Sequence, residues 1–149
     1  AVLNLDALAR TPLAAEPASR LRGCRVLVFK PAFGVPTAWA YGQLAARAPG
    51  SYLPVDKAEA RLAAWCAHAG ASPAELLFNT MELAAGAKFL AIPALLERLH
   101  GEFGLAVRMS GSGSACFALL PEGAPVAAIV DRIRSSWGPS AFIREARLA

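Results

Sequence analysis

A short tract of alternating serine and glycine is the feature of this 149-residue sequence whose residue types could do chemistry. It consists of Ser110, Gly111, Ser112, Gly113 and Ser114. Successive backbone amides in such a tract can form an anion-binding nest, and glycine carries no Cβ to keep a phosphate or a neighbouring loop away. A flexible hairpin tip explains the same composition equally well. Both interpretations stay open on the tract alone, and the first predicts that the glycines act through backbone conformation and close approach.

Other residue types with catalytic or metal-binding chemistry form no recognisable set. Cys24, Cys66 and Cys116 have no Cys-x-x-Cys pair and no histidine at ligand spacing, so we expect no metal site. His68 and His100 fall in helical segments, where solvated or helix-terminal positions are expected. Neither common type of glycine-rich nucleotide loop occurs before a helix. The sequence therefore predicts no catalytic residue and no metal ligand in this chain.

Hydrophobic periodicity predicts the elements that must position the Ser-Gly tract. Short β-rich runs predict strands at 24–29, 105–109, 115–120 and 140–148. Helical spacing predicts helices at 37–48, 56–69 and 126–137. Between the second and the last of these, a short helix from Pro73 is expected to hand over to a longer one that starts after Asn79, kinks or restarts at Pro93 and ends at Phe103. The tract then joins the second strand to the third as a hairpin loop. Three helix starts carry a capping-box pattern, at Asp56, Ser72 and Asn79.

The order of these elements predicts the fold class. One strand, several helices, two strands, a helix and a strand make up a split βαβ plan with extra helices in its first crossover. We therefore expect an α+β, ferredoxin-like sandwich in which helices pack on an antiparallel sheet. Residues 1–23 show no clean period and are expected to be an irregular lead-in to a domain that spans 24–149.

Composition and charge exclude several classes of protein. With 56% hydrophobic and 17% charged residues, the chain is typical of one globular domain. No run reaches the roughly 18 uninterrupted apolar residues that a membrane span needs, and no leader pattern opens the sequence, so a cytoplasmic protein without membrane contact is expected. The net charge of +4 is dispersed, and the densest basic cluster is Arg20, Arg22 and Arg25. No nucleic-acid partner is expected from so short a cluster.

Two segments of the sequence resemble the C-terminal half of GHMP-superfamily small-molecule kinases. In residues 26–41, a strand that ends before a proline leads through Gly-Val-Pro-Thr at 34–37 to a helix, with Tyr41 four residues after the threonine. Residues 108–119, Arg-Met-Ser-Gly-Ser-Gly-Ser-Ala-Cys-Phe-Ala-Leu, are similar to the third signature motif of that family. Asn-Thr-Met-Glu at 79–82 is similar to the Asn-Asp-Leu-Glu of the family and departs from it at the two middle residues.

The resemblance implies a kinase of which this chain forms one part. The phosphate loop and the catalytic Asp and Lys of these kinases belong to an N-terminal half that the matching motifs do not cover. ATP and Mg²⁺ would be bound mainly by that N-terminal kinase domain, which is therefore the expected partner beside a small-molecule substrate. The chain alone is expected to be inactive, and the interface left exposed is expected to favour self-association.

The resemblance also implies roles for individual residues. The loop of Ser110, Gly111, Ser112, Gly113 and Ser114 would face the active-site cleft and support the phosphate loop with its shape and its amides. Thr37 and Tyr41 match positions that line the substrate pocket, although a core aromatic is an equally good interpretation of Tyr41.

The implied reaction belongs to isoprenoid precursor synthesis. It is the phosphorylation of the 2-hydroxyl of 4-diphosphocytidyl-2-C-methyl-D-erythritol. The alternative is a stand-alone ferredoxin-like binding or regulatory module that uses the Ser-Gly loop for a small anion.

Overall fold

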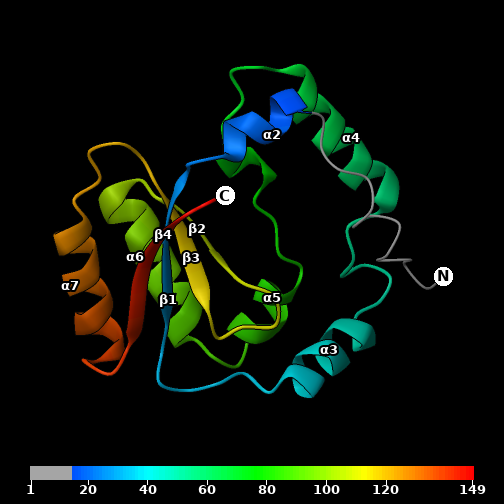
Figure 1. Cartoon of the computed structure of the whole chain (residues 1–149). Coiled ribbons are helices and arrows are strands. Elements are labelled where there is room, and N and C mark those ends of the chain that lie inside the picture. Colours follow the sequence, from blue (N-terminus) through cyan, green and yellow to red (C-terminus); the bar gives the residue numbers. More distant parts are fainter. Residues whose placement is uncertain (1–14) are drawn as a thin grey trace.

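A four-stranded antiparallel sheet lies at the centre of the computed structural model, which describes residues 15–149 (Figure 1). Its strands are β1 (Arg25–Lys30), β2 (Ala106–Met109), β3 (Cys116–Leu120) and β4 (Phe142–Arg147). They follow the order β2-β3-β1-β4, and β1 pairs antiparallel with both β3 and β4. This is the split βαβ order, so the predicted α+β, ferredoxin-like fold class is confirmed.

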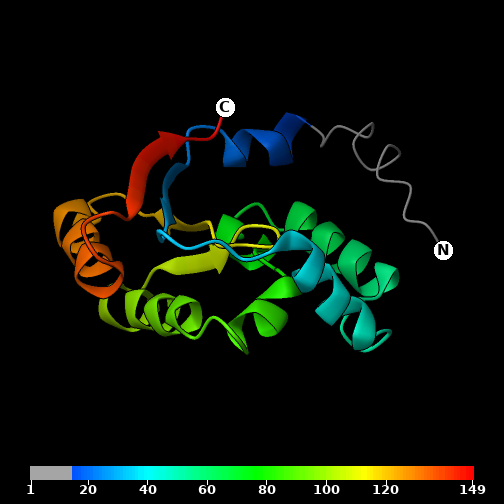
Figure 2. The same ribbon diagram turned by 90° about the horizontal axis from the view of Figure 1, so that it is seen from below.

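Most helices lie in the crossover from β1 to β2. The helices are α2 (Ala15–Leu21), α3 (Thr37–Ala46), α4 (Val55–Ala67), the 3₁₀ helix η1 (Pro73–Leu76), α5 (Met81–Gly86), α6 (Ala91–Phe103) and α7 (Val126–Trp137). Figure 2 shows α6 and α7 together on one side of the sheet and α2 on the other. None of the helices within residues 15–149 is long and apolar enough to cross a bilayer.

The main core lies between the sheet and the helices α6 and α7. Leu27 and Phe29 alternate along β1 and are fully buried, as are Leu99 of α6 and Ile133 of α7. This burial follows from the pattern, because alternate strand residues share one face of the sheet and helix residues with a 3.6-residue period share one stripe. Val26 and Val28 belong to the opposite sheet face, on the side of α2.

One predicted irregular segment is partly helical. The sequence predicts an irregular lead-in over 1–23, but Ala15–Leu21 forms α2, so the prediction is wrong for these seven residues. Pro17 is tolerated because it lies in the first turn, where no helical partner for its nitrogen is needed. The guanidinium of Arg20 ties this helix to α4, since it donates to the carbonyls of Trp65 and His68 at 3.1 and 2.7 Å. Residues 1–14 lie outside the described part of the chain.

Only one of the three capping boxes forms. Ser72 accepts from the Ala74 amide at 3.2 Å, and Glu75 accepts from the Ser72 amide at 2.8 Å, as predicted. The box at Asp56 is wrong, because α4 begins at Val55 after Pro54 and so places Asp56 inside the first turn. The box at Asn79 forms only in part, because Asn79 Oδ1 accepts from the Met81 amide at 2.9 Å, whereas the Glu82 carboxylate accepts from the Met109 amide and not from the Asn79 amide.

The outer edge of β2 is covered by side chains rather than by another strand. His100 Nδ1 lies 3.0 Å from the carbonyl oxygen of Leu105, and Arg108 donates to the carbonyl of Val107 at 2.7 Å. The amide and the carbonyl of Met109 are bound by the side chains of α5 and of the residues before it. Most backbone groups that a further strand would use are therefore occupied along this edge.

Candidate functional site

The Ser-Gly tract forms the hairpin loop between β2 and β3, where the sequence predicts it. The amide of Ser110 donates to the carbonyl of Ala115 at 2.8 Å, and the amide of Gly113 donates to the carbonyl of Ser110 at 3.0 Å. The peptide between Gly113 and Ser114 is cis. Gly111 and Gly113 have φ values of +54° and +83°, which glycine adopts far more readily than other residues. The predicted dependence on backbone conformation is therefore confirmed at both glycines.

The two glycines have different surroundings. A Cβ at Gly113 would lie 2.7 Å from the Met109 sulfur and 3.3 Å from a methyl group of Val35. A Cβ at Gly111 would have no atom within 4 Å among the described residues. The predicted close approach therefore occurs at Gly113, and the approaching groups belong to this chain itself. Gly111 instead leaves open space above the loop backbone.

The segment after β1 is hydrogen-bonded to this loop. The hydroxyls of Thr37 and Ser112 lie 3.1 Å apart, and the hydroxyl of Ser114 donates to the carbonyl of Phe33 at 2.6 Å. Ser114 is a buried polar residue, with 2% of its surface exposed. The structure therefore brings Thr37, 75 residues away in sequence, to the Ser-Gly loop.

Tyr41 lies one helical turn beyond Thr37 on α3. It is 58% exposed, which excludes the interpretation as a core aromatic. An i, i+4 spacing puts Tyr41 and Thr37 on the same side of the helix. No hydrogen bond or ring contact joins Tyr41 to the loop within the described residues, so its predicted role in a substrate pocket stays a prediction.

An aromatic cluster positions the start of α3. The rings of Phe33 and Phe89 stack with centroids 5.9 Å apart, and Trp39 meets Phe89 edge-on at 5.6 Å. The ammonium of Lys88 lies 4.8 Å from the centre of the Trp39 ring. These contacts stabilise the segment that carries Thr37, each by about 0.5–1.5 kcal/mol. The pairing of Phe33 with Phe89 joins residues far apart in sequence, so periodicity carries no signal of it.

Two further polar residues bind the loop, and the sequence predicts only a capping role for them. Asn79 donates through Nδ2 to the carbonyls of Met109 and Gly111, at 2.7 and 2.9 Å. Glu82 accepts from the amide of Met109 at 2.6 Å. Their Asn-x-x-Glu spacing could have indicated this second role, because such polar side chains can bind backbone groups outside the helix as well as cap its start.

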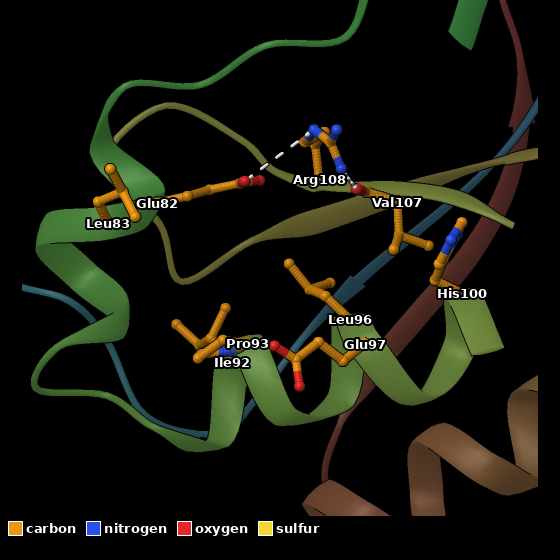
Figure 3. A pocket seen from close by; sticks show the side chains of 9 residues that line it. All are labelled: Glu82, Leu83, Ile92, Pro93, Leu96, Glu97, His100, Val107 and Arg108. Atoms are coloured by element: carbon orange, nitrogen blue, oxygen red, sulfur yellow. Dashed lines mark hydrogen bonds and ion pairs between the residues drawn. The ribbon is translucent and has the colours of Figure 1, made fainter.

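Glu82 lies at the wall of a pocket of about 290 Å³ beside β2. Figure 3 shows Glu82 of α5 and Arg108 of β2 pointing toward one another, with Leu96 of α6 on the other side of the pocket. Arg108 Nε and Glu82 Oε2 are 4.0 Å apart. Burial raises the pKa of Glu82, although the Met109 amide and Arg108 both oppose the shift.

Nearby, burial raises the pKa of the Cys116 thiol to about 12, and the charge of Glu82 adds to this effect. The Cys116 thiol is therefore neutral at physiological pH.

A larger cleft of about 710 Å³ lies between the end of α3 and the start of α5. Its lining includes Arg47, Tyr52, Phe78 and Asn79. Asn79 is thus shared by the cleft and the loop. Among residues 15–149, no group of three or more His, Cys, Asp or Glu side chains could hold a metal ion. The candidate site is therefore a loop that presents backbone amides and hydroxyls, bordered by α3 and α5.

Comparisons with known proteins agree with this arrangement. The profile of the family described as GHMP kinases C terminal matches residues 56–142. A crystal structure of 4-(cytidine 5'-diphospho)-2C-methyl-D-erythritol kinase is similar over 93% of this chain, with a TM-score of 0.61 and 29% sequence identity. The chain covers 46% of that kinase, about half of its length. No curated protein sequence matches significantly.

Proposed function

This chain belongs to the GHMP kinase family by its C-terminal domain, and from that premise we propose that it forms the substrate-side part of an ATP-dependent small-molecule kinase. The proposed reaction transfers the γ-phosphoryl group of ATP to the 2-hydroxyl of 4-diphosphocytidyl-2-C-methyl-D-erythritol. The observation that carries this proposal is the similarity to the kinase of that name over 93% of the chain.

The chain's own part in this reaction is positioning. Phosphoryl transfer depends mainly on placing the two substrates in line and on stabilising the charge of the transferred group. In the described residues, the amides of Gly111 and Ser112 make no backbone hydrogen bond, and the open space at Gly111 lets an anionic group approach them. The bond between Thr37 and Ser112 puts α3 beside these amides. We therefore assign the phosphate side to the loop and the alcohol side to Thr37 and Tyr41.

ATP and Mg²⁺ would be held mainly by an N-terminal kinase domain. The described residues offer no metal-ligand group, so no step of the reaction is assigned to a metal site of this chain. The same domain is the proposed partner, and the sheet face on the side of α2 is its proposed docking surface. That face carries an apolar pocket of about 450 Å³ with Val26, Val28 and Phe117 in its lining. We expect the assembled kinase in the cytoplasm.

The test is an activity measurement on the intact protein that contains this chain. We expect ADP release and a new phosphomonoester when ATP, Mg²⁺ and the diphosphocytidyl methylerythritol are supplied together, and much less with other small-molecule alcohols. The 149-residue chain alone should release no ADP above a buffer control. Absence of turnover by the intact protein would overturn the proposal.

The stand-alone anion-binding module remains the alternative. It predicts that the isolated chain binds inorganic phosphate in a manner that Ser112→Ala weakens, while the intact protein shows no kinase activity. The same preparations therefore decide between the two functions.

A further inference from the structure

We infer that Asn79 and Glu82 are positioning residues for phosphoryl transfer, which act by holding the start of the Ser-Gly loop. The inference rests on the proposed kinase function for its catalytic consequence, and on hydrogen bonds for its geometry. Neither side chain is assigned to the reacting atoms. Both act through Met109, the last residue of β2.

Met109 is held at both of its backbone polar groups. Glu82 Oε1 accepts from its amide at 2.6 Å, and Asn79 Nδ2 donates to its carbonyl at 2.7 Å. The Met109 side chain is buried and lies below Gly113, whose absent Cβ would meet its sulfur at 2.7 Å. A shift of Met109 would therefore move both ends of the loop.

Asn79 also holds the loop directly. Its Nδ2 has two protons, and the second bond reaches the carbonyl of Gly111 at 2.9 Å. Its Oδ1 accepts from the amide of Met81 at 2.9 Å, at the start of α5. Only an amide side chain supplies two donors and one acceptor in this arrangement. An aspartate has the same shape, but it would put a carboxylate oxygen against two carbonyl oxygens.

A cap alone would not use these atoms in this way. In a capping box the Glu82 carboxylate would accept from the Asn79 amide, but it accepts from Met109, 27 residues away in sequence. Both donor bonds of Asn79 likewise leave the helix for the loop. The pair therefore links α5 to the loop, and the loop's position depends on α5.

The catalytic consequence follows from the precision that positioning requires. Misplacement of a reacting group by about 1 Å costs about 100-fold in rate. Loss of the Asn79 bonds should therefore lower kcat by roughly 10- to 100-fold, while the KM for the alcohol changes little because Thr37 and Tyr41 stay in place on α3.

The experiment compares matched variants of the intact protein in two measurements. Asn79→Asp replaces the donor to the two loop carbonyls by an acceptor. Glu82→Ala removes the acceptor for the Met109 amide, and Glu82→Gln keeps an oxygen for that amide. Glu102→Ala is the control, because Glu102 pairs with Arg132 on the far helices at 2.7 Å. The measurements are kcat with KM, and amide hydrogen exchange of the peptide that contains residues 109–114.

We expect Asn79→Asp and Glu82→Ala to lower kcat and to accelerate exchange in the loop peptide about ten-fold, the effect of losing one net hydrogen bond. Glu82→Gln should restore both values nearly to wild type, and Glu102→Ala should leave both unchanged. Unchanged loop exchange in Asn79→Asp and Glu82→Ala, or unchanged kcat despite faster exchange, would overturn the inference. If the wild-type protein has no kinase activity, the proposed function fails, and loop exchange alone then decides whether Asn79 and Glu82 hold the loop.

If Asn79→Asp does not fold, the comparison of Glu82→Ala with Glu82→Gln decides the question. Equal kcat and equal exchange in these two variants would overturn the inference, since they differ in the acceptor for Met109.

Discussion

Gly111 and Gly113 are separated by one residue, and yet the physical causes that make their substitution costly differ. Both need a positive φ, but only Gly113 is in close contact with a neighbouring side chain. We expect Gly111→Ala to destabilise the fold by about 1–2 kcal/mol, the cost of the left-handed conformation alone. Gly113→Ala should cost roughly 2–4 kcal/mol, because the overpacking against Met109 adds to the backbone strain. Chemical denaturation of both variants measures the difference.

The activity of the same two variants separates packing from function. Gly111→Ala puts a methyl group into the open space above the loop, so turnover per folded molecule should fall more than for Gly113→Ala. A larger loss of stability in Gly111→Ala than in Gly113→Ala would contradict the assignment of their surroundings.

Glu82 gives the stability a pH dependence of predictable sign. Burial raises its pKa in the folded state. At a pH just above the ordinary carboxyl pKa, the folded protein therefore still holds a proton that the unfolded chain has lost. Stability contributed by this group is therefore complete at acid pH and is lost as the pH rises through the raised pKa. Gln does not titrate. The stability of Glu82→Gln relative to wild type should increase from pH 4 to pH 7.

Denaturant unfolding of the two proteins across that range measures this change. Cys116 stays neutral over this range, because burial raises the pKa of its thiol to about 12, and all other residues are the same in both proteins. Their effects therefore cancel in the difference. A difference in stability that stays constant with pH would contradict the raised pKa.

At the scale of elements, the Arg20 side chain joins α2 to α4. The Arg20 guanidinium donates to carbonyls of Trp65, Cys66 and His68 and lies 3.9 Å from the centre of the Trp65 ring. Arg20→Ala should destabilise the protein by about 1–3 kcal/mol, since charged hydrogen bonds to the carboxyl end of a helix are lost. Thermal unfolding measures the loss.

Lysine is a partial substitute at this position. Arg20→Lys keeps the charge but not the planar fork, so its stability should fall between wild type and Arg20→Ala. Arg22→Ala removes the same charge from an exposed neighbour and serves as the control. Equal destabilisation by Arg20→Ala and Arg22→Ala would show that charge rather than the helix contact matters.

The strands and the longer helices could be predicted from the sequence because their signal is local. Alternation along β1 and the stripe of Ile129 and Ile133 on α7 place these elements within one or two residues of the structure. The helix α2 was not predictable in this way, because seven residues that include a proline are too few to show a helical period. Its stabilising contact, with α4, comes from a distant part of the sequence. The role of Asn79 was missed for a related reason, since a cap and a long-range contact use the same residue types.

The candidate site could be predicted only in part. The Ser-Gly composition indicates a special loop, and the resemblance indicates Thr37, which the structure places beside Ser112. The packing of Gly113 on Met109 and Val35 depends on tertiary contacts that no spacing in the sequence contains.

At the scale of the whole molecule, the sheet face on the side of α2 is the surface on which an isolated chain should associate. Val26, Val28, Phe117 and Leu119 line its apolar pocket together with Leu148. We expect the isolated chain to self-associate at micromolar concentration, because a continuous apolar surface of this kind is costly in water. Val28→Thr combined with Leu148→Ser should shift it toward monomer in sedimentation equilibrium.

Leu90→Ser is the control for this measurement, because Leu90 is exposed just before α6 and lies outside the pocket lining. It should leave the association unchanged. A wild-type chain that stays monomeric at high concentration would contradict the proposed docking face.

The covered edge of β2 also bears on how this domain avoids aggregation. A bare edge strand recruits strands from other molecules, and the bonds to Leu105, Val107 and Met109 leave few backbone groups for that purpose. Asn79→Ala combined with Glu82→Ala should therefore scatter more light on heating than Glu102→Ala at equal fraction unfolded. Equal scattering would contradict this. The same two side chains that hold a loop for chemistry would then also keep neighbouring copies of the chain from joining their sheets.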